Sequence, residues 1–289
     1  MKILVTGGNG QLGRSLQSAT RNAADEWTFT DVDTLDILDA GAVDCAVRAL
    51  DGGVVVNCAA YTDVERAEES EEAARRVNAD APAALAAACA RHGATLIHIS
   101  TDYVFGGDTA ARPRTEQDAT SPLGAYGRTK LAGERAVAAA GCKALIIRTA
   151  WLYSEYGRNF LLTMLRLMGE GRRPRVVADQ IGTPTYAADL AAAIAEIVAR
   201  RAFEGNEGIY HFTNAGVASW YDFAHAIARL KFGAAAGVDP CTTAEYPTRA
   251  ERPPFSLLDK GKFTRTFGIA PRHWADALGA CLQALEIPG

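Results

Sequence analysis

Hydrophobic positions in the first half of the chain form short apolar runs, and Ala-rich stretches of helical periodicity separate these runs. Runs that are apolar on both faces are typical of parallel strands covered by helices. Strands are predicted at 2–5, 27–31, 53–58, 94–100 and 144–149, and helices at 10–20, 41–50, 64–91 and 123–140. Pro82 indicates a helix start or a break within the stretch 64–91. This alternation predicts right-handed βαβ units and a doubly wound parallel sheet, an α/β fold of the Rossmann type.

The pattern loosens after residue 150, where Arg-rich loops and loops with Gly and Pro separate the remaining elements. Helices are predicted at 158–169 and 187–201, and a further strand at 208–212. We expect a second, smaller α/β domain beside the sheet, assembled partly from a mid-chain excursion. The predicted dinucleotide-binding domain comprises 1–150 and 187–215, and the predicted substrate domain comprises 151–186 and 216–289.

The composition is that of an ordinary globular protein, with 48% hydrophobic and 22% charged residues among 289. The formal net charge of −4 gives no indication of nucleic acid or of an anionic membrane as a partner. No apolar run approaches the roughly 18–20 residues that cross a bilayer. The N-terminal apolar run is short and leads directly into a glycine-rich turn, unlike a secretory signal. We therefore expect no membrane partner.

The cysteines indicate a reducing compartment. The chain has six, and none forms a C-x-x-C pair or stands beside a histidine at metal-ligand spacing. Several lie in apolar surroundings, where a free cysteine behaves as a small hydrophobic residue. The expected location is the cytoplasm, and no metal site is expected at these cysteines.

A glycine-rich loop, Thr-Gly-Gly-Asn-Gly-Gln-Leu-Gly at 6–13, follows the first predicted strand and opens a helix. Glycines in this context permit a tight turn and let the backbone approach a pyrophosphate closely. The N–H groups at the start of the helix favour a diphosphate. The loop therefore predicts a dinucleotide site, whose candidate residues are Gly7, Asn9, Gly10, Gln11 and Leu12.

The end of the second predicted strand bears on the choice of cofactor. Asp31 stands where an acid commonly bonds the adenosine ribose and opposes a 2′-phosphate, which favours NADH. Arg14, just after the glycine loop, could instead attract a 2′-phosphate and favour NADPH. Asp36 and Ile37 are candidates for contact with the adenine, although a surface loop explains Asp36 equally well. The sequence therefore predicts NADH or NADPH without choosing between them.

Three further side chains predict the chemistry. Tyr126 and Lys130 stand four apart in a predicted helix, so they share one face. Thr101 ends the fourth predicted strand, at the edge where a doubly wound sheet binds ligands. Reduction of a ketone needs a hydride on carbon and a proton on oxygen. Tyr126 is the candidate proton donor, and we expect the ammonium of Lys130 and the positive charge of the nicotinamide to lower its pKa. We also expect Lys130 to hold the nicotinamide ribose. Thr101 is the candidate that orients the carbonyl oxygen.

These residues resemble a known family. The glycine loop, Asn57-Cys58-Ala59-Ala60, the strand-end Ser-Thr and the Tyr/Lys pair are similar to those of the extended short-chain dehydrogenase/reductases. Within that group, the chain resembles the dTDP-4-dehydrorhamnose reductases. The matching stretches, spread over most of the chain, are STDYVF (100–105), SPLGAYGRTKLAGE (121–134), RTAWLY (148–153), DQIGTPT (179–185) and RPPFSLLDKGKF (252–263).

The resemblance implies a specific reaction, in which NADPH or NADH reduces dTDP-4-dehydro-6-deoxy-L-mannose to dTDP-L-rhamnose as the last step of dTDP-rhamnose biosynthesis. It implies cofactor contacts at Ala59 and Ala60 as well as at the Tyr/Lys pair. It also implies a substrate site that comprises Thr101, Asp102, Tyr103, Trp151 and Arg252, the last of which has a planar fork suited to a diphosphate.

The chain departs from the family in one place. Some members carry a Glu early in the first helix that helps to bind magnesium, whereas Ser15 stands at that position here. We therefore expect no metal. The expected partner is a dTDP-sugar substrate. The assembly state stays open, with a homodimer among the alternatives.

Other functions remain compatible with the motifs. A nucleotide-sugar 4,6-dehydratase places Asp-Glu after the strand-end Thr, whereas Asp102-Tyr103 here lacks the second acid, which disfavours that reaction. A 4-epimerase uses the same Tyr, Lys and nicotinamide but holds its cofactor permanently. Reductases of other nucleotide-linked 4-keto-deoxysugars share these motifs. A regulatory subunit of methionine adenosyltransferase shares the fold and binds dinucleotide without a known role in turnover.

Overall fold

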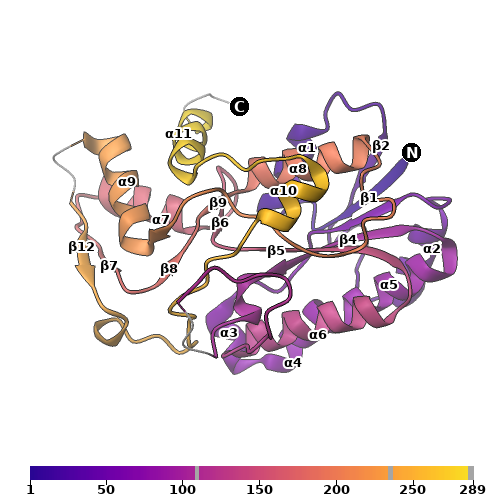
Figure 1. The fold of residues 1–289 in the computed structure, drawn as a ribbon, viewed down its shortest axis with the longest axis horizontal. Coiled ribbons are helices and arrows are strands. Elements are labelled where there is room, and N and C mark those ends of the chain that lie inside the picture. Colours follow the sequence, from indigo (N-terminus) through magenta and orange to yellow (C-terminus); the bar gives the residue numbers. More distant parts are fainter. Residues whose placement is uncertain (108–110, 234–236, 286–289) are drawn as a thin grey trace.

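The computed structural model describes residues 1–107, 111–233 and 237–285. Residues 234–236 and 286–289, which the predicted substrate domain includes, lie outside the described residues. A six-stranded parallel sheet forms the centre of the molecule, in the order β10-β5-β4-β3-β1-β2 (Figure 1). Its strands are β1 (Lys2–Thr6), β2 (Glu26–Phe29), β3 (Val54–Asn57), β4 (Thr95–Thr101), β5 (Lys143–Thr149) and β10 (Gly208–His211). The predicted doubly wound α/β fold is confirmed.

The order of the strands locates the crevice in which such a sheet binds ligands. From β1 the chain moves outward to the edge strand β2 and then returns to β3 on the other side of β1. The direction of winding therefore reverses between β1 and β3. Loops that leave the two strands diverge there, which opens a crevice at their carboxyl ends.

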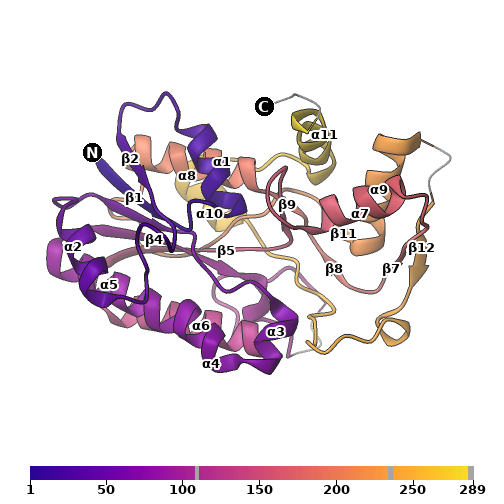
Figure 2. The ribbon, with the colours of Figure 1, turned by 180° about the vertical axis from the view of Figure 1, so that it is seen from behind.

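Helices cover both faces of the sheet, as the apolar runs predict (Figures 1 and 2). On one face lie α1 (Gln11–Ala19), α8 (Ala187–Ala199) and α10 (Gly261–Phe267), whose core residues include Leu16, Ile194 and Phe263. On the other face lie α2 (Ala40–Arg48), α5 (Ala81–His92) and α6 (Ala125–Ala139), whose core residues include Val47, Leu85 and Val137. Because both faces are covered, β3 can be buried at every position.

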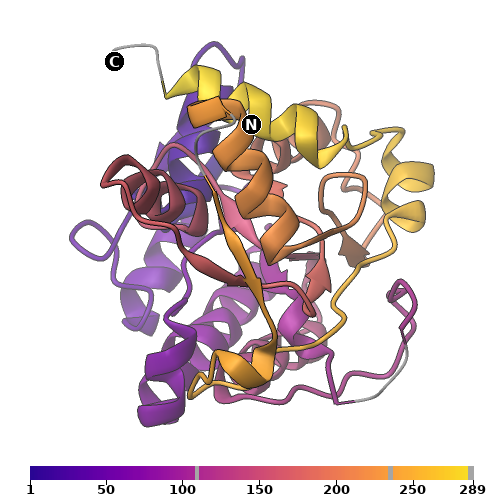
Figure 3. The same ribbon diagram turned by 90° about the vertical axis from the view of Figure 1, so that its left-hand side faces the viewer.

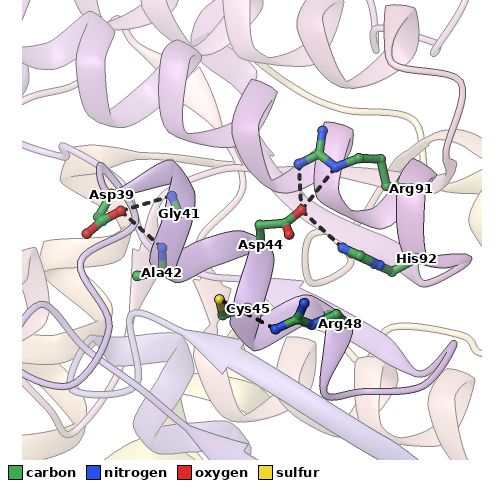
Figure 4. Close-up of polar contacts among 8 residues, drawn as sticks. All are labelled: Asp39, Gly41, Ala42, Asp44, Cys45, Arg48, Arg91 and His92. Carbon is green, nitrogen blue, oxygen red and sulfur yellow. Dashed lines mark hydrogen bonds and ion pairs between the residues drawn. The ribbon is translucent and has the colours of Figure 1, made fainter.

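Polar contacts fix the edge helices α2 and α5 to each other (Figure 4). Asp39 caps α2 by accepting hydrogen bonds from the N–H groups of Gly41 and Ala42. One turn further along, the carboxylate of Asp44 accepts from Arg91 at 2.7 Å and lies 3.0 Å from His92, both at the end of α5. These pairs lie near the surface and contribute little to stability beyond fixing the register of the two helices.

The predicted helical stretch 64–91 is divided into several segments. The elements are α3 (Val64–Glu69), α4 (Glu71–Arg75), a π-helical turn (Arg76–Asp80) and then α5, with Pro82 in its first turn. Ser70 interrupts the first two helices with a non-helical backbone. Asn78, within the π-helical turn, is fully buried. A π-helical turn of this kind often marks a functional site.

A further group of elements packs beside the sheet around its own apolar cluster (Figure 3). Its helices are α7 (Phe160–Gly169), α9 (Trp220–Phe232) and α11 (Trp274–Ala284). Its two-stranded pairs are β6 (Leu152–Tyr153) with β9 (Thr185–Tyr186), β7 (Arg175–Val177) with β12 (Asp239–Cys241), and β8 (Ile181–Gly182) with β11 (Ala218–Ser219). Between these elements the chain returns to the sheet through α8 and β10. Two short 3-10 turns are η2 (Asp102–Val104) and η4 (Thr243–Glu245).

Gly13 gives a test of how closely α1 packs on the glycine loop. A Cβ at this position would lie 2.3 Å from the carbonyl oxygen of Gly7, whereas a Cβ at Gly279 within α11 would meet no atom within 4 Å. We expect Gly13→Ala to lower the free energy of unfolding by about 1–3 kcal/mol. The matched change Gly279→Ala should raise it by up to about 1 kcal/mol, because alanine is the better helix former. Urea unfolding followed by circular dichroism measures both, and equal effects of the two changes would contradict the close packing.

Candidate functional site

The loop between β1 and α1 forms a backbone cradle. Gly7 has a left-handed φ of 69°, and a Cβ there would lie 2.7 Å from the backbone nitrogen of Ala59. The loop therefore lies directly against the chain that leaves β3. Gly10 is the N-cap of α1, and among the described residues no side chain caps this helix. The first N–H groups of α1, at Gln11 and Leu12, are thus suited to a diphosphate, and the cradle fits a dinucleotide.

Asn9 is held from two sides. Its backbone N–H donates to Asp31 at 2.9 Å, and its carbonyl oxygen accepts from the guanidinium of Arg14 at 3.2 Å. The other oxygen of Asp31 accepts the N–H of Val32 at 2.9 Å. The carboxylate that the sequence assigns to the ribose therefore also shapes the glycine loop. Arg14 lines an open polar cavity of about 430 Å³, together with Asn9, Gln17, Ser18, Arg21 and Tyr156.

The other predicted cofactor residues follow β2 and β3 in the chain. Asp36 is exposed and accepts the N–H of Leu38 at 2.9 Å, whereas Ile37 is buried beside it. Ala59 and Ala60 follow β3 and are partly exposed. The close approach of Gly7 to Ala59 brings the β1 and β3 loops together.

Gln11 links the cradle to the elements beside the sheet. Its side-chain oxygen accepts hydrogen bonds from Ser154 at 2.9 Å and from Asn159 at 3.0 Å. Asn159 is also the N-cap of α7, where it accepts the N–H of Leu162 at 3.0 Å. The first helix of the cradle and the first helix after β6 are therefore fixed to each other through one amide.

Thr101, Tyr126 and Lys130 converge at the end of β4. Gly127 makes this approach possible, since a Cβ there would lie 2.2 Å from the carbonyl oxygen of Tyr103. The Thr101 hydroxyl is within hydrogen-bonding reach of Tyr126. The ammonium of Lys130, almost completely buried, donates to the carbonyl oxygen of Ile99 at 2.7 Å. The structure thus brings the three predicted catalytic side chains together.

Burial is the largest effect on the pKa values of Tyr126 and Lys130 in this structure. It raises the pKa of Tyr126 above its usual range, and hydrogen bonding to Thr101 opposes the rise only in part. The lowering expected from Lys130 together with the positive charge of the nicotinamide concerns the cofactor-bound enzyme and stays a prediction. Burial also lowers the pKa of Lys130 to about 8, although the carboxylate of Glu134 opposes this change. At neutral pH Tyr126 keeps its proton and Lys130 keeps its charge.

Asp102 controls the direction of the Thr101 hydroxyl. Thr101 donates its proton to the Oδ1 atom of Asp102 at 3.0 Å and accepts the N–H of Tyr103 at 3.2 Å. For Thr101 to donate to a ligand, its hydroxyl has to turn away from Asp102. Among the described residues, the buried Oδ2 atom of Asp102 has no hydrogen-bond partner of good geometry. Burial raises the pKa of Asp102 to about 6, against the opposing effects of Ser256 and Thr101.

Tyr103 lies between Tyr126 and Arg252 and contacts both side chains. The Tyr103 ring stands edge-on to Tyr126 at 5.4 Å between centroids. Burial raises the pKa of Tyr103 to about 12, with Arg252 opposing the rise. Arg252 is paired with Glu65 at 2.6 Å, and the second oxygen of Glu65 accepts the N–H groups of Arg249 and Ala250. Glu65 therefore presents Arg252 to the site and was not predicted from the sequence.

Trp151 lies on the chain that leaves β5. It has an unusual left-handed φ of 50°, and its ring stacks on Trp220 at 3.8 Å between centroids with an interplanar angle of 11°. A Cβ at Gly182 would lie 2.8 Å from the Trp151 ring. A strained backbone that neighbouring elements hold in place is a common feature of ligand sites. In this conformation the ring lies against Trp220 of α9.

Known proteins resemble this chain over nearly its whole length. The sequence profile of the RmlD substrate binding domain family matches residues 1–287. The chain belongs to this family. A dTDP-4-dehydrorhamnose reductase of Aggregatibacter actinomycetemcomitans is 41% identical over 286 residues, which cover 96% of this chain and 97% of that protein. A probable dTDP-4,6-dihydroxy-2-methyloxan-3-one 4-ketoreductase of Streptomyces antibioticus is 44% identical over 282 residues, which cover 96% and 93%.

Solved structures agree with the family assignment. The crystal structure of a dTDP-4-dehydrorhamnose reductase from Clostridium acetobutylicum superposes with a TM-score of 0.93 at 43% identity, covering 99% of this chain and 100% of that one. The dTDP-4-dehydrorhamnose reductase of Bacillus anthracis, solved in complex with NADP, has a TM-score of 0.90 at 36% identity and covers 98% and 99%. The resemblance stated from the sequence motifs is thereby confirmed.

Several residues that support the site in this RmlD family member were not predicted from the sequence motifs. The amide of buried Asn78 bonds both backbone groups of Tyr61 and also donates to Thr129 on α6. Glu68 accepts the N–H of Ala125 at 2.7 Å and so caps α6. Two glycines within the predicted helix, Gly127 and Gly133, are the sequence signals that neighbouring segments approach α6 closely.

The described residues have neither a metal-binding cluster nor a membrane-spanning helix. No group of three or more His, Cys, Asp or Glu side chains in them is arranged to hold a metal ion. In the same residues, no helix has the length and apolar character needed to span a bilayer.

The raised pKa of Asp102 predicts a pH-dependent effect on stability. Its folded pKa of about 6 lies above the ordinary value of 3.8, so the neutral acid is favoured in the native state. That contribution is complete below about pH 4 and is lost as the pH rises through about 6. Asp102→Asn keeps the site neutral, so it should raise the free energy of unfolding by on the order of 2–3 kcal/mol at pH 8 and by little at pH 4.

Urea unfolding of both proteins at the two pH values measures this effect. The exposed acid Asp33 supplies the control, since Asp33→Asn should leave stability nearly unchanged at both pH values. An Asp102→Asn gain that is equal at pH 4 and pH 8 would remove the ionisation of Asp102 as its cause.

Proposed function

We propose that this chain is an NAD(P)H-dependent oxidoreductase that reduces the 4-keto group of dTDP-4-dehydro-6-deoxy-L-mannose and yields dTDP-L-rhamnose. The observation that carries the proposal is the convergence of Thr101, Tyr126 and Lys130 beside a backbone cradle suited to a diphosphate. Relatives named dTDP-4-dehydrorhamnose reductase, which match nearly the whole chain, support this substrate. The reaction is the last step of dTDP-rhamnose biosynthesis, and we assign it to the cytoplasm.

The cofactor is assigned to the crevice between β1 and β3. Gly7, Gly10 and the first N–H groups of α1 hold its diphosphate, while Asn9 and Asp31 border the adenosine ribose. Asp36 and Ile37 are assigned to the adenine, and Ala59 and Ala60 to the floor of the crevice. The reduced nicotinamide supplies the hydride when it is bound. The NADP complex of the Bacillus anthracis relative supports NADPH as one cofactor, and Arg14 provides a cation for its 2′-phosphate.

Tyr126 supplies the proton in this scheme. Its raised pKa keeps the phenol protonated at neutral pH, which is the form that a reductase needs. Lys130, held as an ammonium against Ile99, stabilises the phenolate that remains after transfer. Thr101 turns its hydroxyl from Asp102 to the carbonyl oxygen and so fixes the ketone relative to Tyr126.

The substrate is assigned to the space between the sheet and the elements beside it. Asp102 and Tyr103 approach from the end of β4, and Trp151 offers a flat apolar wall to the sugar. Arg252, presented by Glu65, provides the cation for the nucleotide diphosphate. We accordingly divide the chain into a dinucleotide-binding domain of 1–150 and 187–215 and a substrate domain of 151–186 and 216–289. A homodimer is the assembly we propose.

A second candidate is reduction of a different dTDP-linked 4-keto-deoxysugar. The Streptomyces antibioticus relative, a probable 4-ketoreductase of another dTDP-sugar at 44% identity, favours this alternative specifically. Both candidates use the same catalytic residues and differ in the sugar, since the sugar in that relative's name has one hydroxyl fewer on its ring. A non-catalytic regulatory subunit would instead bind dinucleotide, form a stable complex with a second protein and consume no reduced cofactor.

The first experiment supplies NADPH or NADH with dTDP-4-keto-6-deoxyglucose, in the presence and absence of its 3,5-epimerase. Oxidation is followed by the loss of nicotinamide absorbance, and the product is identified by NMR. We expect oxidation that depends on the epimerase and yields dTDP-L-rhamnose. Oxidation without the epimerase would favour the second candidate. Tight cofactor binding with no oxidation in any combination would contradict a reductase.

Tyr126→Phe tests the proton donor. The phenylalanine ring keeps the packing against Tyr103 but has no proton to give, so we expect kcat to fall by about 10²–10⁴-fold. The Kd of the reduced cofactor, measured by calorimetry, should change little because the glycine cradle is intact. Tyr246→Phe, at an exposed tyrosine, is the matched control and should turn over normally. Near-normal kcat in Tyr126→Phe would exclude the assigned role.

A further inference from the structure

A row of buried polar residues crosses the face of the sheet that α6 covers. Residues in register on neighbouring parallel strands point to the same face, and here one polar position follows another across five strands. Thr6 on β1 is paired with Asn57 on β3, and Asn57 with His98 on β4. Two residues beyond His98, the row continues through Ser100 of β4, Arg148 of β5 and His211 of β10, which are also in register and buried.

Glu134 of α6 supplies the negative charge of this row. Its Oε1 atom accepts from the Ser100 hydroxyl at 2.5 Å and from Arg148 at 2.8 Å, and its Oε2 atom accepts from Arg148 at 2.7 Å. The side chains of Glu134 and Arg148 are each only 3% exposed. The third guanidinium nitrogen of Arg148, Nη1, lies 3.4 Å from the Nε2 atom of His211. Burial lowers the pKa of His211 to about 3, so this histidine is neutral.

Glu134 also stands on the face of α6 that carries Tyr126 and Lys130. The three positions are separated by four residues each, so their side chains follow one another along one side of the helix. Lys130 is 2% exposed, and its ammonium donates to a carbonyl oxygen, Ile99. A buried ammonium bound to a neutral acceptor keeps its proton more readily when a carboxylate lies nearby.

We infer that Glu134 is a positioning residue of the proposed reaction: fixed by Ser100 and Arg148, its carboxylate keeps Lys130 charged beneath Tyr126. The expected effect on turnover rests on the proposed function. The effect of Glu134 on the charge of Lys130 does not. The other titratable groups that face Lys130 are Cys58 at the end of β3 and His98 on β4. Burial raises the pKa of Cys58 to about 12 and lowers that of His98, so both are neutral.

The alternative is an ion pair that serves packing alone. A buried Arg–Glu pair contributes little net stability compared with apolar residues of similar volume. The two roles differ in the sign of their effects. Removing the carboxylate should make Lys130 lose its proton more easily, whereas removing the guanidinium should make Lys130 hold it more tightly. Damage to packing would not produce opposite shifts.

The test is a direct titration of Lys130 by NMR in protein with ¹³C- and ¹⁵N-labelled lysine. The chain has only six lysines, at positions 2, 130, 143, 231, 260 and 262, so the signals can be resolved. Lys130→Arg assigns the signal. We expect Glu134→Gln to shift the titration of Lys130 downward by about one pH unit or more, and Arg148→Gln to shift it upward. Glu134→Asp, which keeps the charge, should remain near wild type.

Glu134→Gln and Arg148→Gln are each expected to shift the titration of Lys130 in a stated direction. If one variant folds poorly, the shift in the other still tests the inference. No shift in Glu134→Gln, or shifts of the same direction in both variants, would overturn the inference. In turnover, the alkaline limb of the kcat profile of Glu134→Gln should move to lower pH, and Glu134→Asp should restore it. Because the titration uses neither cofactor nor sugar, its result stands apart from any failure of the proposed reaction.

Discussion

The approach of α6 to the end of β4 is the constraint on which the site depends. Tyr126 can reach Thr101 only because Gly127 carries no side chain, since a Cβ there would overlap the carbonyl oxygen of Tyr103. The same device recurs at Gly133, where a Cβ would lie 2.1 Å from the carbonyl oxygen of Asn78. Backbone thus packs directly on backbone at both points of contact along α6. Close packing of this kind fixes the catalytic side chains more firmly than contacts between flexible side chains would.

The same constraint explains the polar groups beneath the site. When α6 lies this close to the sheet, Lys130 is removed from water, and a buried ammonium needs nearby acceptors and negative charge. The carbonyl oxygen of Ile99 accepts the hydrogen bond of the ammonium, and the carboxylate of Glu134 supplies the negative charge. Ser100 and Arg148 donate hydrogen bonds to that carboxylate. A row of polar residues in the interior of a parallel sheet makes the fold less stable than apolar residues at the same positions would. Its position under the side chains that we propose as catalytic is the reason we give for its presence.

The part of the site that we propose for the substrate is built differently. There the residues come from segments far apart in the chain and are positioned by partners rather than by the sheet. Glu65 of α3 holds Arg252, and Trp220 of α9 holds Trp151. Such contacts can change between relatives without disturbing the catalytic residues. This separation is consistent with a family whose members are named for different dTDP-sugars.

The sequence by itself determined the doubly wound sheet, the glycine cradle and the three catalytic candidates. Each of these depends on local periodicity or on a motif that one segment completes, as with the i, i+4 spacing of Tyr126 and Lys130. Only the tertiary structure decided which residues support them. Glu134, Asn78 and Glu65 act through partners 14 to 187 residues away, and no local pattern records such pairs. It also decided that burial is the largest effect on the pKa of Tyr126, because burial depends on what the fold packs around a side chain and not on its neighbours in the chain.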